Sequence, residues 1–290
     1  MPVALEPLPD HRDRLIVVGS SVRKNLDILH PHLQTLLYQE LPPRTRLHFV
    51  FVEDFTKEQA DAKDCLKDFL QHTGGELLRG MPSGIGDFSD DHPQAHQWSL
   101  EAMRRVGANK NKILKRALDL KADAVWLVDS DLLLDRTVLA SLLAAEKPVA
   151  CAIYWTRWAR QTTETQKIWA GPTAWLRHPY FLDGRGMDEA TFRQKLVSRQ
   201  LTRVYGQGAC SLISRKVLEA GIDFSPAAEV PQQGLMAGED RQFCIKCERG
   251  HIEMYADCWP DIFHIYHRTD YVPRIPEMRE RLGVTGNVDD

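Results

Sequence analysis

The sequence has little excess charge, few cysteines and no long apolar run. Its 37 lysine and arginine residues nearly balance its 40 aspartate and glutamate residues, so no basic surplus predicts general binding to nucleic acid or to an anionic membrane. No window approaches the roughly 18 uninterrupted apolar residues of a membrane-spanning helix. Six cysteines in 290 residues are too few for a disulfide scaffold. We therefore expect a globular protein with reduced thiols.

A secretion signal is also missing from the start of the sequence. The segment MPVALEPLPDHRDR carries prolines and charges where such a signal needs a basic start and a continuous apolar stretch. We expect a cytoplasmic location. There is no internal repeat, and the length allows one large or two small domains.

Four soft metal ligands follow one another late in the sequence: Cys244, Cys247, His251 and Cys258. Zinc sites need a turn between close ligands. The residues around Cys244 instead have a helical pattern, which would put Cys244, Cys247 and His251 on one buried stripe. We expect helix packing here, and structural zinc is the alternative.

Apolar runs and helical patterns alternate over the first 155 residues. The predicted strands cover residues 15–20, 47–53, 124–128 and 149–154. The predicted helices cover residues 25–40, 57–72, 98–120 and 137–146. This order predicts an α/β fold with a mostly parallel sheet and helices on both faces.

The later part of the chain is less regular. Residues 80–93 are rich in turn formers and acids and predict a surface loop. Regular alternation stops after Trp155. The predicted elements beyond it are helices over 188–199, 215–219 and 239–249 and strands over 209–214 and 261–267.

Ligands of such a sheet bind beyond the carboxyl ends of its strands. Three predicted strands end in polar residues: Ser20 and Ser21, Glu53 and Asp54, and Asp129 with Asp131. We expect all of them along one edge of the sheet. This edge is therefore the predicted site.

The residues Asp129 and Asp131 by themselves allow two interpretations. Carboxylates turned toward one point repel each other, and a divalent cation such as Mg²⁺ or Mn²⁺, shared with a diphosphate, removes that repulsion. In the alternative, Asp129 caps a turn and Asp131 starts the next helix.

Four segments in order extend the argument: VWLVDSDL at 125–132, GACSLISR at 208–215, GED at 238–240 and FHIYH at 263–267. Together they resemble motifs of the nucleotide-sugar glycosyltransferases of the GT-A fold, particularly bacterial family 2-like enzymes. The similarity covers about residues 13–268. It implies a GT-A (Rossmann-like) domain over 13–270, divided into a nucleotide-sugar half (13–155) and an acceptor half (156–270). The remaining predicted parts are an extension over 1–12 and a tail over 271–290.

The resemblance also implies a metal site for Mn²⁺ or Mg²⁺. Asp129 would contact the ribose of the donor, and Asp131 would bind the metal on its diphosphate. His264 matches the histidine that completes this site, with His267 as a weaker alternative. Without the resemblance, a histidine in such a strand is more often a buried core residue.

Two acidic residues match the catalytic motif of the family. The resemblance implies that Asp240 takes the proton of the acceptor hydroxyl, as in inverting members, and that Glu239 holds the acceptor. In the alternative, both acids only stabilise the N-terminus of a helix.

Further binding residues follow from the same resemblance. The predicted surface for the nucleotide and sugar comprises Gly19, Ser20, Ser21, Glu53, Asp54, Ser130 and Gly208. On the helix before the D-x-D, Arg105, Lys110 and Asn111 could reach the base or phosphates, although charges on a surface helix are usually solvated. Trp155 and Trp158 could stack on the acceptor or pack in the core.

We therefore expect a metal-dependent enzyme that moves a sugar from a nucleoside-diphosphate sugar to an acceptor hydroxyl. A retaining transferase, a nucleotidyltransferase on the same fold and a non-catalytic sugar-binding module are the alternatives. The acceptor could be a glycan, lipid-linked sugar, protein, metabolite or modified nucleic acid. The long segment 162–203 departs from the family pattern, so no acceptor is inferred from the resemblance.

Overall fold

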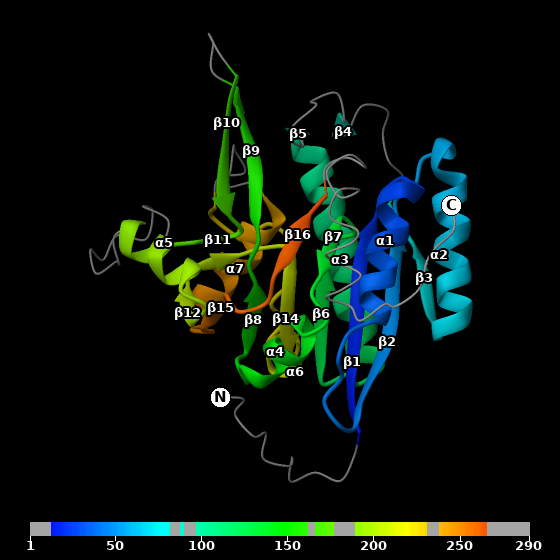
Figure 1. Ribbon diagram of the computed structural model, residues 1–290, viewed down its shortest axis with the longest axis horizontal. Coiled ribbons are helices and arrows are strands. Elements are labelled where there is room, and N and C mark those ends of the chain that lie inside the picture. Colours follow the sequence, from blue (N-terminus) through cyan, green and yellow to red (C-terminus); the bar gives the residue numbers. More distant parts are fainter. Residues whose placement is uncertain are drawn as a thin grey trace, which may run out of the picture.

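The computed structural model describes residues 13–81, 88–89, 97–161, 166–176, 189–230 and 238–265. At its centre lies one eight-stranded sheet with the order β12-β15-β8-β14-β6-β1-β2-β3 (Figure 1). Helices pack on both faces of this sheet. The predicted α/β class is confirmed.

The strands of the central sheet are β1 (Arg14–Val22), β2 (Thr45–Glu53), β3 (Gly75–Arg79), β6 (Ala124–Val128), β8 (Val149–Ala152), β12 (Leu201–Val204), β14 (Cys210–Ser214) and β15 (Met254–Asp257). β1 pairs in parallel with β2 and β6, β2 with β3, and β8 with β15. β14 runs antiparallel between β6 and β8, and β12 is antiparallel to β15. The sheet is therefore mostly parallel, as predicted.

Successive residues of each strand point to opposite faces, so the sheet has two cores. Ile16 and Val18 belong to one core and Val17 to the other. The first core includes side chains of α1 (Leu26–Leu37), α2 (Ala60–Thr73) and α4 (Val138–Ala144). The second includes α3 (Leu100–Asp119), α5 (Glu189–Val197), α6 (Arg215–Glu219) and α7 (Glu239–Arg249). A short 3₁₀ helix, η1 (Lys57–Gln59), precedes α2.

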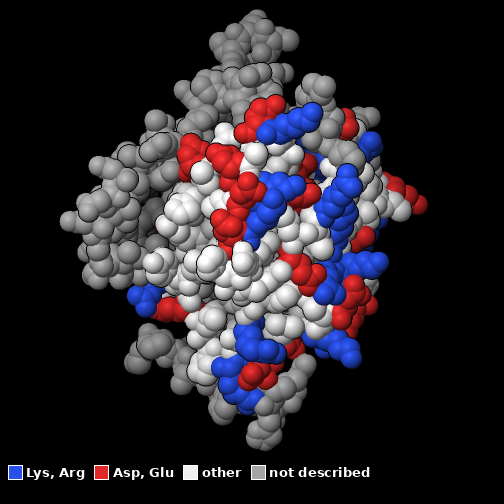
Figure 2. All heavy atoms as spheres, turned by 90° about the vertical axis from the view of Figure 1, so that its right-hand side faces the viewer, with Lys and Arg blue, Asp and Glu red and all other residues white. Residues whose placement is uncertain are grey.

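The helices within the described ranges include none that is both long and apolar enough to cross a bilayer. On the face that carries α2 and β3, acidic and basic side chains lie side by side (Figure 2). Lys67 and Asp64 form an ion pair within α2 (2.7 Å), and Glu76 of β3 pairs with Arg116 of α3 (2.7 Å). This mixture agrees with the nearly balanced charge of the sequence.

Smaller pairs of strands surround the central sheet. They are β7 (Leu132–Leu134) with β16 (Ile262–His264), β9 (Trp155–Gln161) with β10 (Gln166–Pro172), β11 (Ala174–Trp175) with β13 (Gly206–Gln207), and β4 (Phe88–Ser89) with β5 (Gln97–Trp98). The β9–β10 hairpin projects beyond the carboxyl end of β8 (Figure 1). In the β7–β16 pair, His264 lies opposite Leu132.

Several elements differ from the prediction. Three strands of the central sheet, β3, β12 and β15, were not predicted, and neither was the β9–β10 hairpin in the region where alternation stops. The last predicted strand, 261–267, is observed as the shorter β16, which pairs with β7 outside the central sheet. β6, α6 and α7 have the predicted bounds.

The cysteines are free thiols, and five of the six are buried. Cys244 and Cys247 pack in the second core, as the helical pattern predicted. The prediction for His251 was wrong, because α7 ends at Arg249 and His251 lies exposed in the following turn with a φ of 55°. That the cysteines bind no zinc stays a prediction.

Helix α3 packs closely on β1 at Gly19. A Cβ atom at this position would overlap Cγ2 of Ile113 and lie 3.2 Å from its Cδ1. Ile113 is fully buried, so it has little room to move. Close packing of the helix thus accounts for the glycine at this strand end.

We expect Gly19→Ala to lower the free energy of unfolding by about 1–3 kcal/mol, because the added methyl group overfills the core. Urea denaturation of the single variants and of Gly19→Ala/Ile113→Ala measures the effect. Removing the Ile113 side chain makes room for the methyl group, so the cost of the double variant should be smaller than the sum of the single costs. Additive costs would contradict this account.

Candidate active site at the carboxyl edge of the sheet

The polar strand ends lie next to one another, as predicted. In the parallel register of β1 with β2, Val22 is opposite Glu53, and Gly19 of β1 is opposite Leu127 of β6. β6 ends at Val128, and the chain then turns before β7 begins at Leu132. The D-x-D residues occupy this turn, beside the end of β1.

Asp131 and His264 face each other across the β7–β16 pair. Oδ2 of Asp131 is 3.4 Å from Nε2 of His264, and both side chains are less than a tenth exposed. The backbone fixes this approach, because Ile265 N–H donates to the Asp131 carbonyl at 2.8 Å. The Tyr154 ring also stacks on His264, with ring centroids 5.5 Å apart. The structure thus brings together two of the three predicted metal ligands.

Sequence reasoning missed Lys24, which lies in the loop between β1 and α1. Its Nζ is 2.9 Å from Oδ2 of Asp131, the same oxygen that faces His264. The Lys24 side chain is 14% exposed. Its position directly after a strand that ends at this edge was the available signal.

His32 of α1 is a second residue that the sequence did not reveal. Burial lowers the pKa of His32, against the raising effect of its hydrogen bond to Leu132, so the ring is neutral. Its Nδ1 lies 2.7 Å from the carbonyl oxygen of Leu132, directly after Asp131, and donates to that oxygen in the matching tautomer. His32 therefore ties the first core to the chain that carries Asp131.

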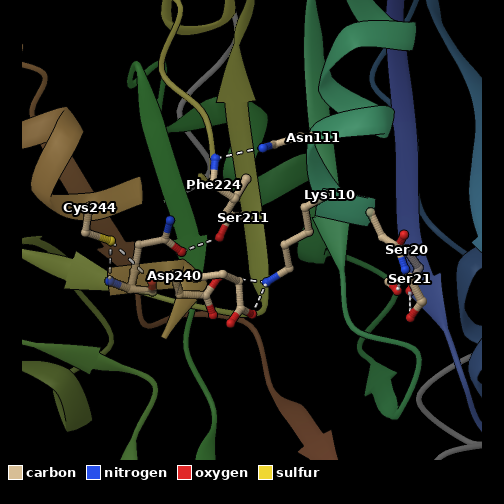
Figure 3. A network of polar contacts seen from close by, with 11 residues as sticks. Ser20, Ser21, Lys110, Asn111, Ser211, Phe224, Asp240 and Cys244 are labelled. Carbon is tan, nitrogen blue, oxygen red and sulfur yellow. Dashed lines mark hydrogen bonds and ion pairs between the residues drawn. The ribbon is translucent and has the colours of Figure 1, made fainter. Parts of the chain in front are cut away.

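The predicted catalytic acids meet at Lys110. The Lys110 Nζ is 2.7 Å from Oδ1 of Asp240 and 3.0 Å from Oε1 of Glu239. The ammonium also lies 5.1 Å from the centre of the Phe224 ring. In Figure 3, Lys110 extends toward Asp240, on the side away from Ser20 and Ser21. A buried cation on α3 thus binds the N-terminus of α7.

The charges in this region shift one another's pKa. Burial alone would lower the pKa of Lys110, but Asp240, Glu239 and Asp129 raise it well above its usual value. Burial raises the pKa of Asp129 to about 8, and Asp131 adds to this effect while Lys110 opposes it. Burial also raises the pKa of Glu239. Lys110 lowers this pKa, and Asp240 raises it. Lys110 is therefore the cation on which these carboxylates depend.

Gly208 lies against the other side of the Asp240 carboxylate. A Cβ atom at Gly208 would be 2.6 Å from Oδ2 of Asp240. Lys110 holds Oδ1 of the same group. Asp240 is thus confined between the ammonium and the Gly208 backbone, with 25% of its side chain exposed.

The remaining predicted donor-binding residues lie along the ends of β1 and β2. Asn109 of α3 donates to Oγ of Ser21 at 3.0 Å. Ser20 and Ser130 are buried, and the Ser130 hydroxyl lies 3.5 Å from the Ser21 carbonyl oxygen. Glu53 pairs with Lys63 at 2.6 Å.

The alternative interpretation, in which the charged side chains of Arg105 and Lys110 on α3 are solvated, is wrong. Arg105 and Lys110 are each 4% exposed. Arg105 Nε donates to Oδ2 of the buried Asp54 at 3.0 Å. Asn111 accepts a hydrogen bond from the Phe224 backbone N–H at 2.8 Å. These side chains therefore make structural contacts within the chain.

Evidence on the predicted acceptor residues is uneven. Trp155 begins β9 and is 43% exposed, so it does not pack fully in the core. The Trp158 side chain and His267 lie outside the described residues. Glu239 is only 11% exposed and binds Lys110.

The three predicted metal ligands do not form one set. Within the described ranges, no group of three or more His, Cys, Asp or Glu side chains is arranged to hold a metal ion. Asp131 and His264 form a pair, whereas Asp129 interacts electrostatically with Lys110 and the α7 acids. A carboxylate oxygen and an imidazole nitrogen are suitable ligands for Mn²⁺, so the pair fits part of such a site.

Comparisons with known proteins agree on the fold. No protein-family model matches the chain. A glycosyltransferase 25 family member from Drosophila pseudoobscura pseudoobscura is 27% identical over 173 residues, which are 55% of this chain and 26% of that protein. The crystal structure of GalNAc-T7 with UDP, GalNAc and Mn²⁺ has a TM-score of 0.52 and 13% identity, covering 89% of this chain and 45% of the other. Mannosyltransferase PcManGT from Pyrobaculum calidifontis, solved with GDP-Man and Mn²⁺, has a TM-score of 0.47 and 14% identity, covering 89% and 60%.

The likeness to GalNAc-T7 confirms the predicted GT-A fold, and the glycosyltransferase relative agrees with the predicted resemblance. The chain spans about a quarter of the curated relative and less than half of GalNAc-T7.

Removing the Lys110 ammonium from its contacts with Asp240 and Glu239 should destabilise the fold. We expect Lys110→Met to lower the free energy of unfolding at pH 7 by about 1–3 kcal/mol, because Glu239 and Asp240, which are 11% and 25% exposed, lose their cation. Lys112→Met is the control, since Lys112 is on the same helix and binds only the Arg79 carbonyl among its described hydrogen bonds. It should cost less than about 1 kcal/mol. Equal costs for the two variants in urea denaturation would refute the role of Lys110.

Proposed function

We propose that this chain is a glycosyltransferase that moves a sugar from a nucleoside-diphosphate sugar to an acceptor hydroxyl, with inversion at the anomeric carbon. One observation carries this proposal: within a GT-A fold, the Asp131–His264 pair and the Asp240–Lys110 pair lie at the same strand edge. The UDP, GalNAc and Mn²⁺ bound to GalNAc-T7 support a nucleotide-sugar donor.

A divalent cation, Mn²⁺ or Mg²⁺, is part of the proposal. Oδ2 of Asp131 and Nε2 of His264 would hold it. The charge of the region supports a cation. We define the carboxylate cluster as Asp129, Asp131, Glu239 and Asp240 with the ammonium groups of Lys24 and Lys110. It contains more carboxyl groups than ammonium groups. A bound cation would stabilise the charge that develops on the leaving diphosphate.

Asp240 is the proposed general base. Its carboxylate is held on one side by Lys110 and on the other by Gly208, yet a quarter of the side chain is exposed. A base in this state has a fixed orientation and remains accessible to an acceptor. Asp240 would accept the hydroxyl proton as the oxygen attacks the anomeric carbon, and the diphosphate would leave from the opposite face.

The donor and acceptor would bind on either side of the D-x-D turn. Ser20, Ser21 and Asp54 at the ends of β1 and β2 would form the nucleotide side. The exposed indole of Trp155 would offer a flat surface to the acceptor. Glu239 supports the site through Lys110.

Hydrolysis of the sugar donor, monitored as released nucleoside diphosphate, tests the function without a known acceptor. With a panel of nucleotide sugars, we expect hydrolysis in Mn²⁺ and a decrease of at least about tenfold after EDTA, which corresponds to about 1.4 kcal/mol of lost transition-state stabilisation. Added Mn²⁺ should restore the rate. Asp131→Ala should reproduce the loss in the presence of Mn²⁺. Full activity after exhaustive chelation would exclude the metal.

The role of Asp240 makes a separate prediction. Asp240→Asn should lower turnover by about 10²-fold or more, because the amide cannot accept the proton. Nucleoside-diphosphate binding, measured by calorimetry, should stay within about threefold of the parent. Asp64→Asn is the control, since Asp64 pairs with Lys67 on the surface of α2. Lost nucleotide binding with nearly normal turnover would make Asp240 a structural residue and remove the support for inversion.

A further inference from the structure

One oxygen of Asp131 already has a cation from this chain. Nζ of Lys24 lies 2.9 Å from Oδ2, and Nε2 of His264 lies 3.4 Å from the same atom. The side chains of Lys24, Asp131 and His264 are 14%, 8% and 7% exposed. The ammonium of Lys24 and the imidazole of His264 therefore meet at one shielded carboxylate oxygen.

The position of this ammonium has a direct electrostatic consequence. A buried carboxylate is unfavourable without a counter-charge, and Lys24 supplies one. A divalent cation on Asp131 and His264 would bind the same oxygen, so two positive charges would then lie within a few ångströms of each other. Low exposure weakens the screening of that repulsion. The ammonium and such a metal ion would thus compete for Oδ2.

We propose that Lys24 is a built-in counter-cation of Asp131 that the divalent cation must displace, so this lysine sets the metal affinity of the site. The proposal rests on the proposed function, which assigns the cation to Asp131 and His264. In the metal-free protein, Lys24 keeps the charged Asp131 in place at the turn before β7. Metal binding includes the free-energy cost of moving the ammonium away.

The test is a direct measurement of Mn²⁺ binding to the full chain. Binding is monitored as the decrease of the free-ion signal in electron paramagnetic resonance. We expect Lys24→Met to bind Mn²⁺ at least about tenfold more tightly than the parent, because the competing charge is gone. Lys24→Arg keeps the charge and should stay close to the parent affinity. Lys67→Met removes a lysine from a surface Lys–Asp pair with a 2.7 Å contact and should leave the affinity unchanged.

A thermal melt gives a second measurement on the same variants. Without metal, Lys24→Met should melt at a lower temperature than the parent, and saturating Mn²⁺ should raise its melting temperature by more than that of the parent. Circular dichroism before each titration checks that the variant is folded, and Lys24→Gln serves if Lys24→Met is not.

Unchanged or weaker Mn²⁺ binding by a folded Lys24 variant would overturn the proposal. So would absence of Mn²⁺ binding in both the parent and the variant. Donor hydrolysis distinguishes these results from failure of the proposed function: hydrolysis that persists without bound Mn²⁺ leaves a glycosyltransferase and removes only the role of Lys24.

Discussion

The buried ammonium of Lys110 is the interaction on which the rest of the site depends. It reaches from α3, which packs on β1, to the first turn of α7, more than a hundred residues later in the chain. Asp240 and Glu239 would otherwise be two like charges at one helix end. With Lys110 between them, the N-terminus of α7 is attached to the helix that precedes the D-x-D turn. The proposed base and the proposed donor site are therefore connected through α3.

The parallel sheet explains why these groups meet. Parallel strands have their carboxyl ends at the same edge, so polar residues that follow β1, β2 and β6 gather there whatever their separation in sequence. The antiparallel β14 contributes the opposite end: the residues just before it, including Gly208, reach the same edge. β16 then adds His264 by pairing with β7 rather than with the central sheet.

Local patterns in the sequence predicted the elements that form this frame and missed what depends on distant contacts. The buried run of β6 and the helix of α7 were predicted because apolar periodicity is a local property. β3 begins one residue after the C-cap of α2, and its side chains are only partly buried or exposed, so its apolar signal is weak. The burial of Lys110 follows from carboxylates on another helix, and no pattern within α3 distinguishes a lysine that faces acids from one that faces water. Lys24 was missed although it closely follows β1, a strand that ends at this edge.

The two lysines divide the acids of the D-x-D turn into two groups with different chemistry. Asp131 faces Lys24 and His264, and here we propose that a cation displaces Lys24, whose side chain is 14% exposed. Asp129 interacts electrostatically with the buried Lys110, and burial raises the pKa of Asp129 to about 8. In this proposal the counter-cation of Asp131 can be replaced by a metal ion, whereas the counter-cation on the Asp129 side, Lys110, stays in place. Because Lys110 already pairs with Asp240, the proposed binding of a metal at Asp131 would leave the orientation of Asp240 in place.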